Sequence, residues 1–371
     1  MSFTRTGVVA IIAVSLGVSA GVLAFAPPQG QLKADRAAAQ GLPLSAPLPA
    51  SMPAGTTLVV GDPVTQRILE HNGWLKDLPF QIRWAQITGG PGVTEAFHAR
   101  VLDVGTGANI PPIHATWVGI PVRTIAVRFR DAPLDHPAFE LAVAPQAGIN
   151  SLADLRGKRI AFSPGQVQGE IVLRALEAQG LSKADVKLVE LPSTSPDFYI
   201  NALVGGMVDV APIGAGAPVK RYLERYAASG GKVLRHPGFR DDMINLFVRV
   251  ETLQDPAKAA ALRTYVRLWA RAAEWGDAHP EELAQMYYVR NQGLSPEDAR
   301  YVVRAAGHPA IPGDWSEAIR LQQASIDLMA REIGHKSFDA ATLFDRRYEA
   351  FAATEAAAYR ADPVPVALAQ R

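Results

Sequence analysis

The chain has 371 residues and no cysteine, with 37 lysines and arginines against 36 aspartates and glutamates and a formal net charge of +1. This length suits two α/β lobes, each with its own core, better than one average domain. The balanced charge excludes the strongly basic face of a nucleic-acid-binding protein, and the lack of cysteine excludes disulfides, thiolate metal sites and cysteine nucleophiles.

The N-terminal residues 1–26 have the features of an export signal. Arg5 precedes an apolar run over residues 7–26, with small-x-small cleavage patterns at Ala24-Phe25-Ala26 and Val18-Ser19-Ala20. The run is also long enough to span a bilayer, so it is either a cleaved signal peptide or an inner-membrane anchor. Because an exported protein without disulfides is typical of the bacterial periplasm, we expect a periplasmic protein.

Residues 27–56 are rich in proline, alanine, glycine and glutamine and are predicted to be a linker. The fold is expected to begin at Thr57, where a β-branched apolar run indicates a buried strand. Helices are predicted at 65–73 and 92–99, and further strands at 80–86, 101–105, 122–129 and 139–144. Strands that alternate with helices in this way predict a parallel sheet with covered faces.

A second block repeats this plan. Ser151 and Ser182 each precede an aspartate by three positions, which is the pattern of a capping box. The predicted strands are 159–162, 186–190 and 208–213, and the predicted helices are 169–180, 198–204 and 218–228. The next strand, at 245–250, is predicted to return to the first lobe, because everything after it is helical. Two such crossings between the lobes would form a hinge.

The predicted fold is therefore α/β, with lobe 1 formed by 57–147 and 245–345 and lobe 2 by 148–244. In the C-terminal third, capping residues at Asp255, Ser295 and Asp314 mark three helix starts. One more helix is predicted over 338–359, so that 346–371 form a C-terminal helix and tail.

Four loops carry glycine, proline or small polar residues where a strand passes into a helix, namely 62–66, 88–94, 106–111 and 163–169. The first N–H groups of a helix lack internal partners and lie at the positive end of its dipole, so such loops can hold an oxyanion. Each loop alone is more simply a turn. Because open parallel sheets bind ligands beyond the carboxyl ends of their strands, the set predicts a shared anion-binding crevice. Ser195 is expected to be a helix cap, and residues 212–218 to line the crevice from lobe 2.

Several enzyme signatures are absent from the sequence. None of the glycine loops continues as a Walker phosphate loop, and no Gly-x-Gly-x-x-Gly follows a strand. The one Gly-x-Ser-x-Gly pattern, at 17–21, lies inside the export segment. The eight histidines stand singly, without zinc-ligand spacing. We therefore expect no catalytic residues, no metal and no cofactor.

Two arginines and one helical stripe with aromatic residues are further candidates for a binding role. Arg128 and Arg130 follow the predicted strand at 122–129 and could bind a carboxylate or sulfonate through a forked pair of donors. A solvated surface position is commoner for such arginines and is the one we expect. Tyr265, Trp269 and Ala272 share one helical stripe, which predicts core packing.

Four segments together resemble a known family. They are Gly-Gly-Pro-Gly-Val-Thr-Glu-Ala-Phe from 89, Leu-Asp-Val-Gly-Thr-Gly-Ala-Asn-Ile-Pro-Pro from 102, Ser-Leu-Ala-Asp-Leu-Arg-Gly-Lys-Arg-Ile-Ala-Phe-Ser-Pro-Gly-Gln from 151 and Gly-Gly-Met-Val-Asp-Val-Ala-Pro-Ile from 205. Over about residues 57–253 the chain resembles periplasmic substrate-binding proteins of ABC importers, in the type II clamp fold. Its likeness is to the aliphatic sulfonate, taurine and nitrate-binding branch.

The resemblance implies a monomer of two lobes that close on a small organic anion and deliver it to an ABC permease in the inner membrane. Carried onto matching positions, it implies these ligand-binding residues: Thr65, Gln66, Gly90, Thr94, Gly107, Asn109, Ser163, Gln166 and Gln168, with Gly214 opposite. The chain departs from the branch at 213–218, where a tryptophan and an acidic residue are common before the proline. A wider pocket is expected there.

Two other functions stay open on the sequence alone. One is an enzyme on the same clamp fold, although the desulfinase version relies on a cysteine nucleophile that this chain lacks. The other is a membrane-tethered ligand sensor, which an uncleaved N-terminal run would favour.

Overall fold

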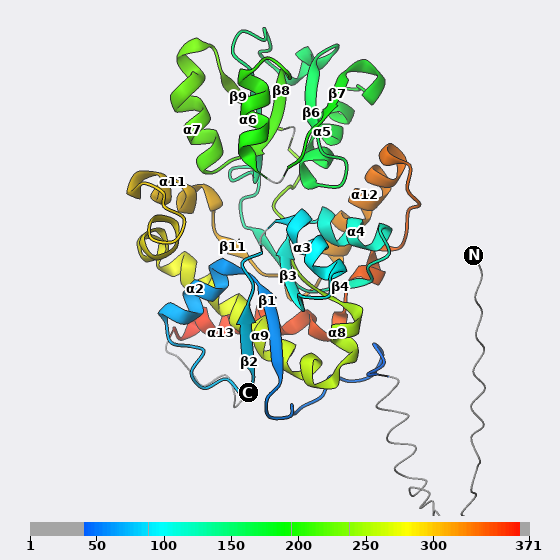
Figure 1. The fold of residues 1–371 in the computed structure, drawn as a ribbon, viewed down its shortest axis with the longest axis vertical. Helices are drawn as coiled ribbons and strands as arrows, with labels where there is room; N and C mark the ends of the chain where they lie inside the picture. Colours follow the sequence, from blue (N-terminus) through cyan, green and yellow to red (C-terminus); the bar gives the residue numbers. More distant parts are fainter. Residues whose placement is uncertain (1–40, 88, 194, 237, 364–371) are drawn as a thin grey trace, which may run out of the picture. The chain divides into compact units, whose positions relative to one another are not determined.

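A computed structural model describes residues 41–363 except 88, 194 and 237 (Figure 1). The predicted export segment lies outside the described residues. None of the helices within them combines the length and apolar character that a bilayer crossing requires. The rest of the fold is built on two sheets, each covered by helices.

The first sheet has six strands in the order β11-β4-β10-β3-β1-β2. Their bounds are β1 (Thr57–Gly61), β2 (Gln81–Trp84), β3 (Val104–Gly107), β4 (Val122–Arg130), β10 (Ile244–Arg249) and β11 (Pro309–Ala310). β1 pairs in parallel with β2 and β3, but β10 runs antiparallel to β3 and β4, and β11 antiparallel to β4. The predicted parallel pairing holds for β1, β2 and β3, but the sheet is mixed, because β10 enters directly from the other lobe instead of returning over a helix.

The second sheet has five strands in the order β7-β6-β8-β5-β9. They are β5 (Phe139–Val143), β6 (Arg159–Phe162), β7 (Lys187–Glu190), β8 (Val210–Gly214) and β9 (Lys232–Leu234). β6 is parallel to β7 and β8, whereas β5 is antiparallel to β8 and β9. The predicted lobe boundary at 148 comes too late, because β5 already belongs to this sheet. A local apolar pattern does not tell which sheet a strand joins.

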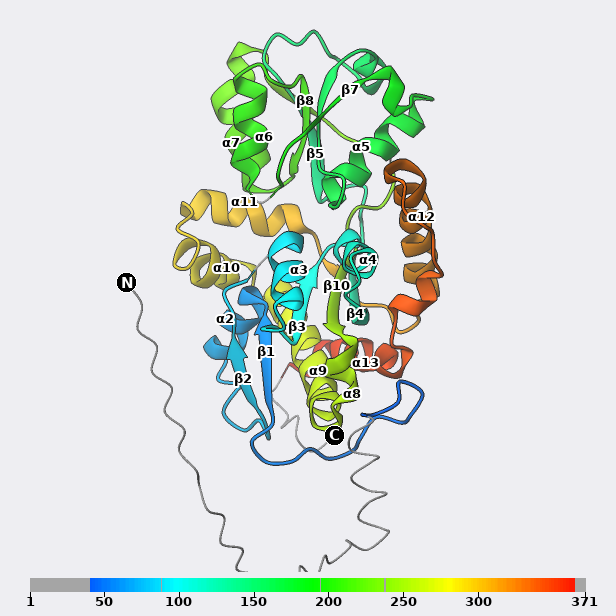
Figure 2. The same cartoon turned by 45° about the vertical axis from the view of Figure 1, so that its right-hand side comes forward.

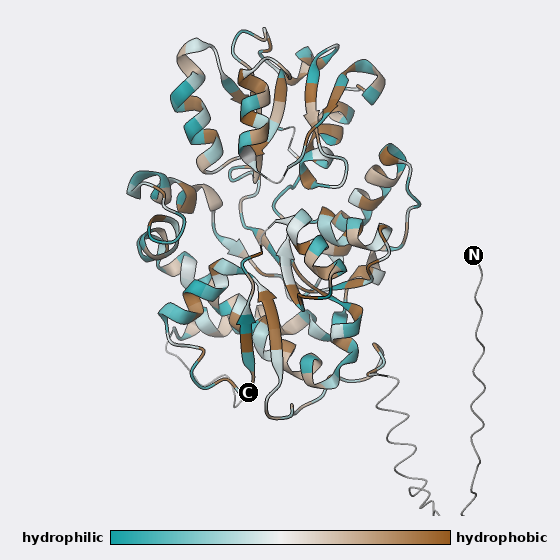
Figure 3. Ribbon diagram, viewed as in Figure 1, coloured by the Kyte–Doolittle hydropathy of each residue, from teal (hydrophilic) through white to brown (hydrophobic). Residues whose placement is uncertain are grey.

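The five-stranded sheet is covered by α5 (Val167–Ala178), α6 (Pro196–Val204) and α7 (Ala217–Tyr226). The remaining helices accompany the six-stranded sheet: α2 (Pro63–His71), α3 (Gly90–His98), α4 (Ile110–Trp117), α8 (Val250–Gln254), α9 (Pro256–Ala278), α10 (Pro280–Leu283), α11 (Pro296–Ala306), α12 (Ser316–Ile333) and α13 (Glu349–Ala361). A π-helix, Ala284–Val289, follows α10 directly. The central strands are strongly apolar, and the helices present hydrophilic residues on one side (Figure 3).

Most of the predicted capping residues act as caps in the structure, but Asp314 is not the cap of α12, because Trp315 is the residue that precedes this helix. The side chains of Ser195, Asp255 and Ser295 each accept a hydrogen bond from a backbone N–H in the first turn of the following helix. Both predicted capping boxes, at Ser151 and Ser182, are present. Each cap satisfies helix donors that would otherwise lack a partner.

The single helix predicted over 338–359 is wrong. The chain instead forms two 3₁₀ turns, Ala340–Leu343 and Arg346–Tyr348, before α13 begins. Between the turns, Phe344 forms a bridge with Thr124 of β4, and the N–H of Asp345 donates to the carbonyl of Thr124 at 3.0 Å. This pairing with the sheet edge requires extended backbone, so it interrupts the helix.

The predicted linker is also partly structured. Leu44, Leu48 and Met52 pack against the main hydrophobic core. The N–H of Leu42 donates to the carbonyl of Gln254 at 2.6 Å, and Arg263 donates to the carbonyl of Pro49 at 3.0 Å. This part of the segment therefore lies against the six-stranded lobe as an ordered strap, and residues before 41 are outside the described part.

Two segments cross between the sheets, one from β4 to β5 and one from β9 to β10, and two buried aspartates join them. The N–H of Arg130 donates to Asp242 at 2.7 Å. The N–H groups of Ala138 and Phe139 donate to the two oxygens of Asp241 at 2.9 and 2.8 Å. Since both carboxylates lie on the second crossing and their partners on the first, the two crossings form one hydrogen-bonded hinge.

Candidate functional site

A cavity of about 990 Å³ is lined by residues of both lobes. The five-stranded lobe contributes Phe139, Gln166, Val167, Gln168 and Ser193. The two crossings contribute His136 and Asp242, and the rest of the lining comes from the six-stranded lobe and the segments after β10. Such a volume lies at the upper end of the range for small-molecule sites.

All four strand-to-helix loops reach the cavity. Asp62 caps α2 after β1, and the loops before α3 and α4 contribute Gly90 and Gly107. From the other lobe, Gln166 is the residue before α5. The predicted convergence of these loops on one cavity is therefore observed, and it follows from their place beyond the carboxyl ends of parallel strands.

Of the ten residues predicted to contact a ligand, half line this cavity. They are Thr65, Gly90, Gly107, Gln166 and Gln168. Their roles in binding stay predictions. Ser193, which lies in the loop before α6, also lines the cavity.

The other five are outside the lining and have partners elsewhere in the protein. Gln66 donates to Glu70 at 2.7 Å, and Thr94 donates to the carbonyl of Gly90 at 2.9 Å. The hydroxyl of Ser163 contacts the hydroxyl of Tyr199 at 2.6 Å. Gly214 ends β8. The side chain of the last of the five, Asn109, forms hydrogen bonds with residues of both lobes.

Asn109 is part of a polar contact between the lobes. Its side-chain amide donates to Glu170 at the start of α5 at 2.6 Å and to Ser325 of α12 at 2.9 Å. The hydroxyl of Ser325 also donates to Glu170 at 2.6 Å. Elsewhere between the lobes, Lys220 of α7 pairs with Asp298 of α11 at 2.8 Å. Figures 1 and 2 place α5 and α12 on one side of the region between the sheets and α7 and α11 on the other.

Arg128 lines the cavity, so the expectation of a solvated surface position is wrong for this residue. Its guanidinium carbon lies 5.3 Å from the ring centroid of Trp269, on α9. Burial lowers the pKa of Arg128, and the nearby charge of Asp62 opposes that shift. The side chain of Arg128 is covered by Trp269 of α9, which the sequence of β4 does not reveal.

Within the described residues, no hydrogen bond or ion pair occupies the guanidinium of Arg128. Arg130 differs, because its guanidinium donates to the carbonyls of His136, Pro137 and Ala305 at 2.5, 2.8 and 3.5 Å. Arg130 therefore stabilises the hinge. The donors of Arg128 have no such partner among the described residues, so they can bind a ligand.

Asp62 lies beside Arg128 and is itself buried, with an exposed fraction of 5%. Burial raises the pKa of its carboxyl group, while hydrogen bonds from Thr65 and the charge of Arg128 act in the opposite direction. The hydroxyl of Thr65 donates to Asp62 at 2.7 Å and its N–H at 3.2 Å. A single buried carboxylate thus caps α2 and balances the arginine.

The C-terminal part of the lining carries residues that were not predicted as site residues. Trp269, predicted as core, is buried but faces the cavity at one edge, together with Tyr288 of the π-helix and His308. The signal for Trp269 was ambiguous, because a helical stripe looks the same whether it meets other side chains or a ligand. Nothing in the local sequence marks Tyr288 or His308.

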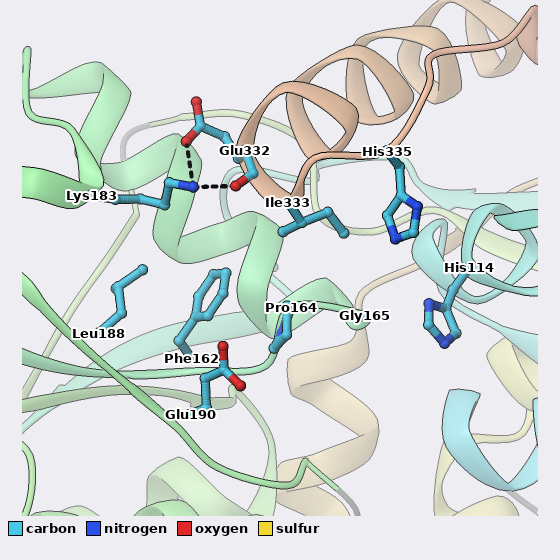
Figure 4. A pocket seen from close by; sticks show the side chains of 10 residues that line it. All are labelled: His114, Phe162, Pro164, Gly165, Lys183, Leu188, Glu190, Glu332, Ile333 and His335. Atoms are coloured by element: carbon cyan, nitrogen blue, oxygen red, sulfur yellow. Dashed lines mark hydrogen bonds and ion pairs between the residues drawn. The ribbon is translucent and has the colours of Figure 1, made fainter. Parts of the chain in front are cut away.

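A second cavity, of about 450 Å³, lies beyond the loop that carries Pro164 and Gly165 (Figure 4). Lys183 pairs with Glu332 at its edge, and His114 and His335 come from the six-stranded side. None of the ten predicted residues lines it. The larger cavity is therefore the candidate binding site.

Two lobes, a hinge of two crossings and a cavity lined by both lobes define the type II periplasmic binding protein fold. The family model described as NMT1/THI5 like matches residues 70–283. The chain belongs to this family.

The proteins similar to the chain include the following curated relative and solved structures. The "Putative aliphatic sulfonates-binding protein" of Escherichia coli (strain K12) is 32% identical over 107 residues, which are 29% of this chain and 32% of the relative, so the match spans about a third of the relative's length. The periplasmic aliphatic sulphonate binding protein SsuA from Escherichia coli superposes with a TM-score of 0.65 at 20% identity, over 78% of this chain and 92% of the other.

The alkanesulfonate-binding protein SsuA from Xanthomonas axonopodis pv. citri, bound to MOPS, superposes with a TM-score of 0.62 at 20% identity, over 82% and 99% of the two chains. At these identities the superpositions establish the fold.

Proposed function

We propose that the protein is the solute-binding component of an ABC importer and captures an organic anion, first of all an aliphatic sulfonate, between its two lobes. The observation that carries this proposal is the position of Arg128 in a cavity reached by four helix starts. A half-buried guanidinium whose donors have no hydrogen-bond partner among the described residues favours a planar or tetrahedral oxyanion.

The charge balance of the site supports an anion as the guest. A charged group that is removed from water needs an opposite charge nearby, and Asp62 supplies a negative charge near Arg128. The helix starts add partial positive charge without a second cation. The sulfonates named for the similar proteins fit this requirement, because a sulfonate stays ionised throughout the physiological pH range.

The polar contacts between the lobes support capture by closure. Asn109 lies within one of the cavity loops and Glu170 directly follows another, so opening the lobes would break their hydrogen bond. A permease that recognises the closed arrangement would then distinguish loaded from empty protein. We further propose an exported, periplasmic monomer that delivers its ligand to a permease in the inner membrane.

We propose no enzymatic activity, since the chain has no cysteine to act as a nucleophile of the desulfinase type. A membrane-tethered sensor is the second candidate, and the observation that favours it is the length of the apolar run at 7–26. N-terminal sequencing of the exported protein separates the two, since a free carrier loses the run and a tethered sensor keeps it.

Isothermal titration with methanesulfonate, taurine, nitrate and acetate tests the anion assignment. We expect heat and a rise in the melting temperature for at least one sulfonate. The absence of both effects for all four compounds would refute it.

A further inference from the structure

Tyr288 is the only tyrosine among the described residues that line the large cavity. It lies on the π-helix between α10 and α11, a kind of helix that is rare and is often found at functional sites. Its hydroxyl has no hydrogen-bond partner within the part of the chain that the structure describes, and it is not among the unpartnered polar atoms that are shut off from solvent. The hydroxyl is therefore open to the cavity.

The preceding residue, Tyr287, has a different environment. Its side chain is buried, and its hydroxyl accepts a hydrogen bond from the amide of Gln292 at 3.4 Å. The rings of Tyr287 and Tyr288 pack edge to face, with 5.0 Å between their centroids. Tyr287 is absent from the described lining of the cavity. The π-helix thus directs one phenol into the protein and the next one toward the cavity.

The fold brings Tyr288 to the same part of the cavity as Arg128. The π-helix packs against α2, and the residue that caps α2 is Asp62, which lies beside Arg128. Burial raises the pKa of Tyr288, whereas the positive charges of Arg128 and Arg130 lower it. The pKa remains above its usual value, so the phenol keeps its proton at neutral pH and is a hydrogen-bond donor.

The guanidinium of Arg128 has donors for two oxygens of an anion. One of its faces lies over the ring of Trp269, with 5.3 Å between the guanidinium carbon and the ring centroid. Because the N–H donors of a guanidinium lie in its plane, a contact on one face leaves them available. A forked pair of these donors binds two oxygens of a carboxylate or a sulfonate. A third oxygen needs a donor from another residue.

We infer that Tyr288 is a specificity-determining residue, whose hydroxyl donates to a third oxygen of the anion that Arg128 binds through two. This inference rests on the proposed function and adds a residue that selects among anions. A sulfonate has three oxygens and a carboxylate has two, so only the sulfonate uses both Arg128 and Tyr288 fully. The phenol therefore favours a sulfonate over a carboxylate of the same size.

Methanesulfonate and acetate test this selection, because they share a methyl group and differ in the number of oxygens. Tyr288→Phe keeps the ring and removes the hydroxyl. Loss of a hydrogen bond to a charged acceptor should weaken methanesulfonate binding by about 10- to 150-fold. The affinity for acetate should not change, so the preference for the sulfonate falls by the same factor. Calorimetric titration of the exported protein measures methanesulfonate, and displacement of methanesulfonate measures acetate.

Tyr287→Phe is the matched control. It removes a hydroxyl from the same π-helix, but that hydroxyl is paired with Gln292 and lies outside the described lining. We expect it to leave the affinities for both anions unchanged. Melting temperatures without ligand, which should be similar for Tyr288→Phe and the unaltered protein, separate a lost ligand contact from a disturbed fold.

The outcomes distinguish the inference from the proposed function. A loss of methanesulfonate affinity that is confined to Tyr288→Phe supports the inference, and it does so by itself if acetate binds too weakly to be measured. Unchanged methanesulfonate binding in Tyr288→Phe, or an equal loss for both anions, overturns the inference while the anion site stands. If no anion binds the unaltered protein, the proposed function fails and the inference fails with it.

Discussion

The amide of Asn109, before α4, donates a 2.6 Å hydrogen bond to the buried carboxylate of Glu170, on α5 of the opposite lobe. Each residue lies one turn or less from a loop that reaches the cavity. The same contact thus joins the lobes and fixes the two loops relative to each other. Because Ser325 of α12 donates to Glu170 as well, three separate elements depend on one carboxylate.

Removing this contact should favour lobe opening. In Asn109→Ala, the carboxylate loses one charge-assisted hydrogen bond, worth about 1.5–3 kcal/mol. We expect a larger radius of gyration in small-angle X-ray scattering without ligand and weaker sulfonate binding by calorimetry. Asn201→Ala, at an exposed position of α6, is the control. Equal scattering curves and affinities for the two variants would contradict this role for Asn109.

Replacing Arg128 should weaken anion binding. Arg128→Gln keeps some polar character but removes the charge and the forked donors, which costs about 10- to 150-fold in affinity. Titration with a sulfonate measures the loss. Arg83→Gln removes an exposed arginine from β2 and should leave the affinity unchanged. An unchanged affinity in Arg128→Gln would show that the head group binds elsewhere.

Sulfonate binding should tighten as the pH falls. A bound anion beside Arg128 disfavours the ionised form of Asp62, so binding raises the pKa of Asp62 above its already raised value in the free protein. Affinity then increases as the pH falls through the pKa that Asp62 has in the complex. It levels off below the pKa that Asp62 has in the free protein. Titrations in two buffers of different ionisation enthalpy should detect proton uptake.

The pH dependence should vanish in Asp62→Asn, which keeps an oxygen to accept from Thr65 but cannot ionise. The same variant should bind sulfonate more tightly than the unaltered protein at about pH 7, because it no longer competes for Arg128. Asp135→Asn, on an exposed loop position, should retain the dependence. Proton uptake that persists in Asp62→Asn would assign the titration to another group.

A buried ion pair should make α13 essential to the six-stranded lobe. Arg271 of α9 donates to Glu355 of α13 at 2.7 Å, and their side chains are 5% and 4% exposed. Glu355→Gln leaves the guanidinium without its counter-charge, so we expect the free energy of unfolding to fall by about 3–5 kcal/mol. Urea denaturation measures it. Glu317→Gln, which breaks an exposed pair with Arg320, should have no resolvable effect, and similar losses in both would refute the prediction.

The sequence predicted what is encoded locally. Strand 159–162 matches β6, and the caps at Ser195, Asp255 and Ser295 lie where the helices begin, because capping and apolar runs act over a few residues. The convergence of the glycine loops was also accessible, since it follows from the rule for parallel sheets.

The features that the sequence did not predict depend on contacts between residues that are far apart in the sequence. Phe344 is extended and not helical because it forms a bridge with Thr124. Arg128 is shielded from solvent because Trp269 of α9 covers its guanidinium. Neither residue carries a local signal of these contacts. Gln66 and Thr94 satisfy a family pattern, yet intrahelical partners already use their side-chain donors, which only coordinates reveal.

A crystal structure grown with a bound aliphatic sulfonate is the decisive measurement for anion capture at Arg128. We expect sulfonate oxygens within hydrogen-bond distance of the guanidinium of Arg128, inside the cavity between the lobes. A sulfonate bound away from Arg128, or an empty cavity between the lobes at saturating ligand, would contradict this site.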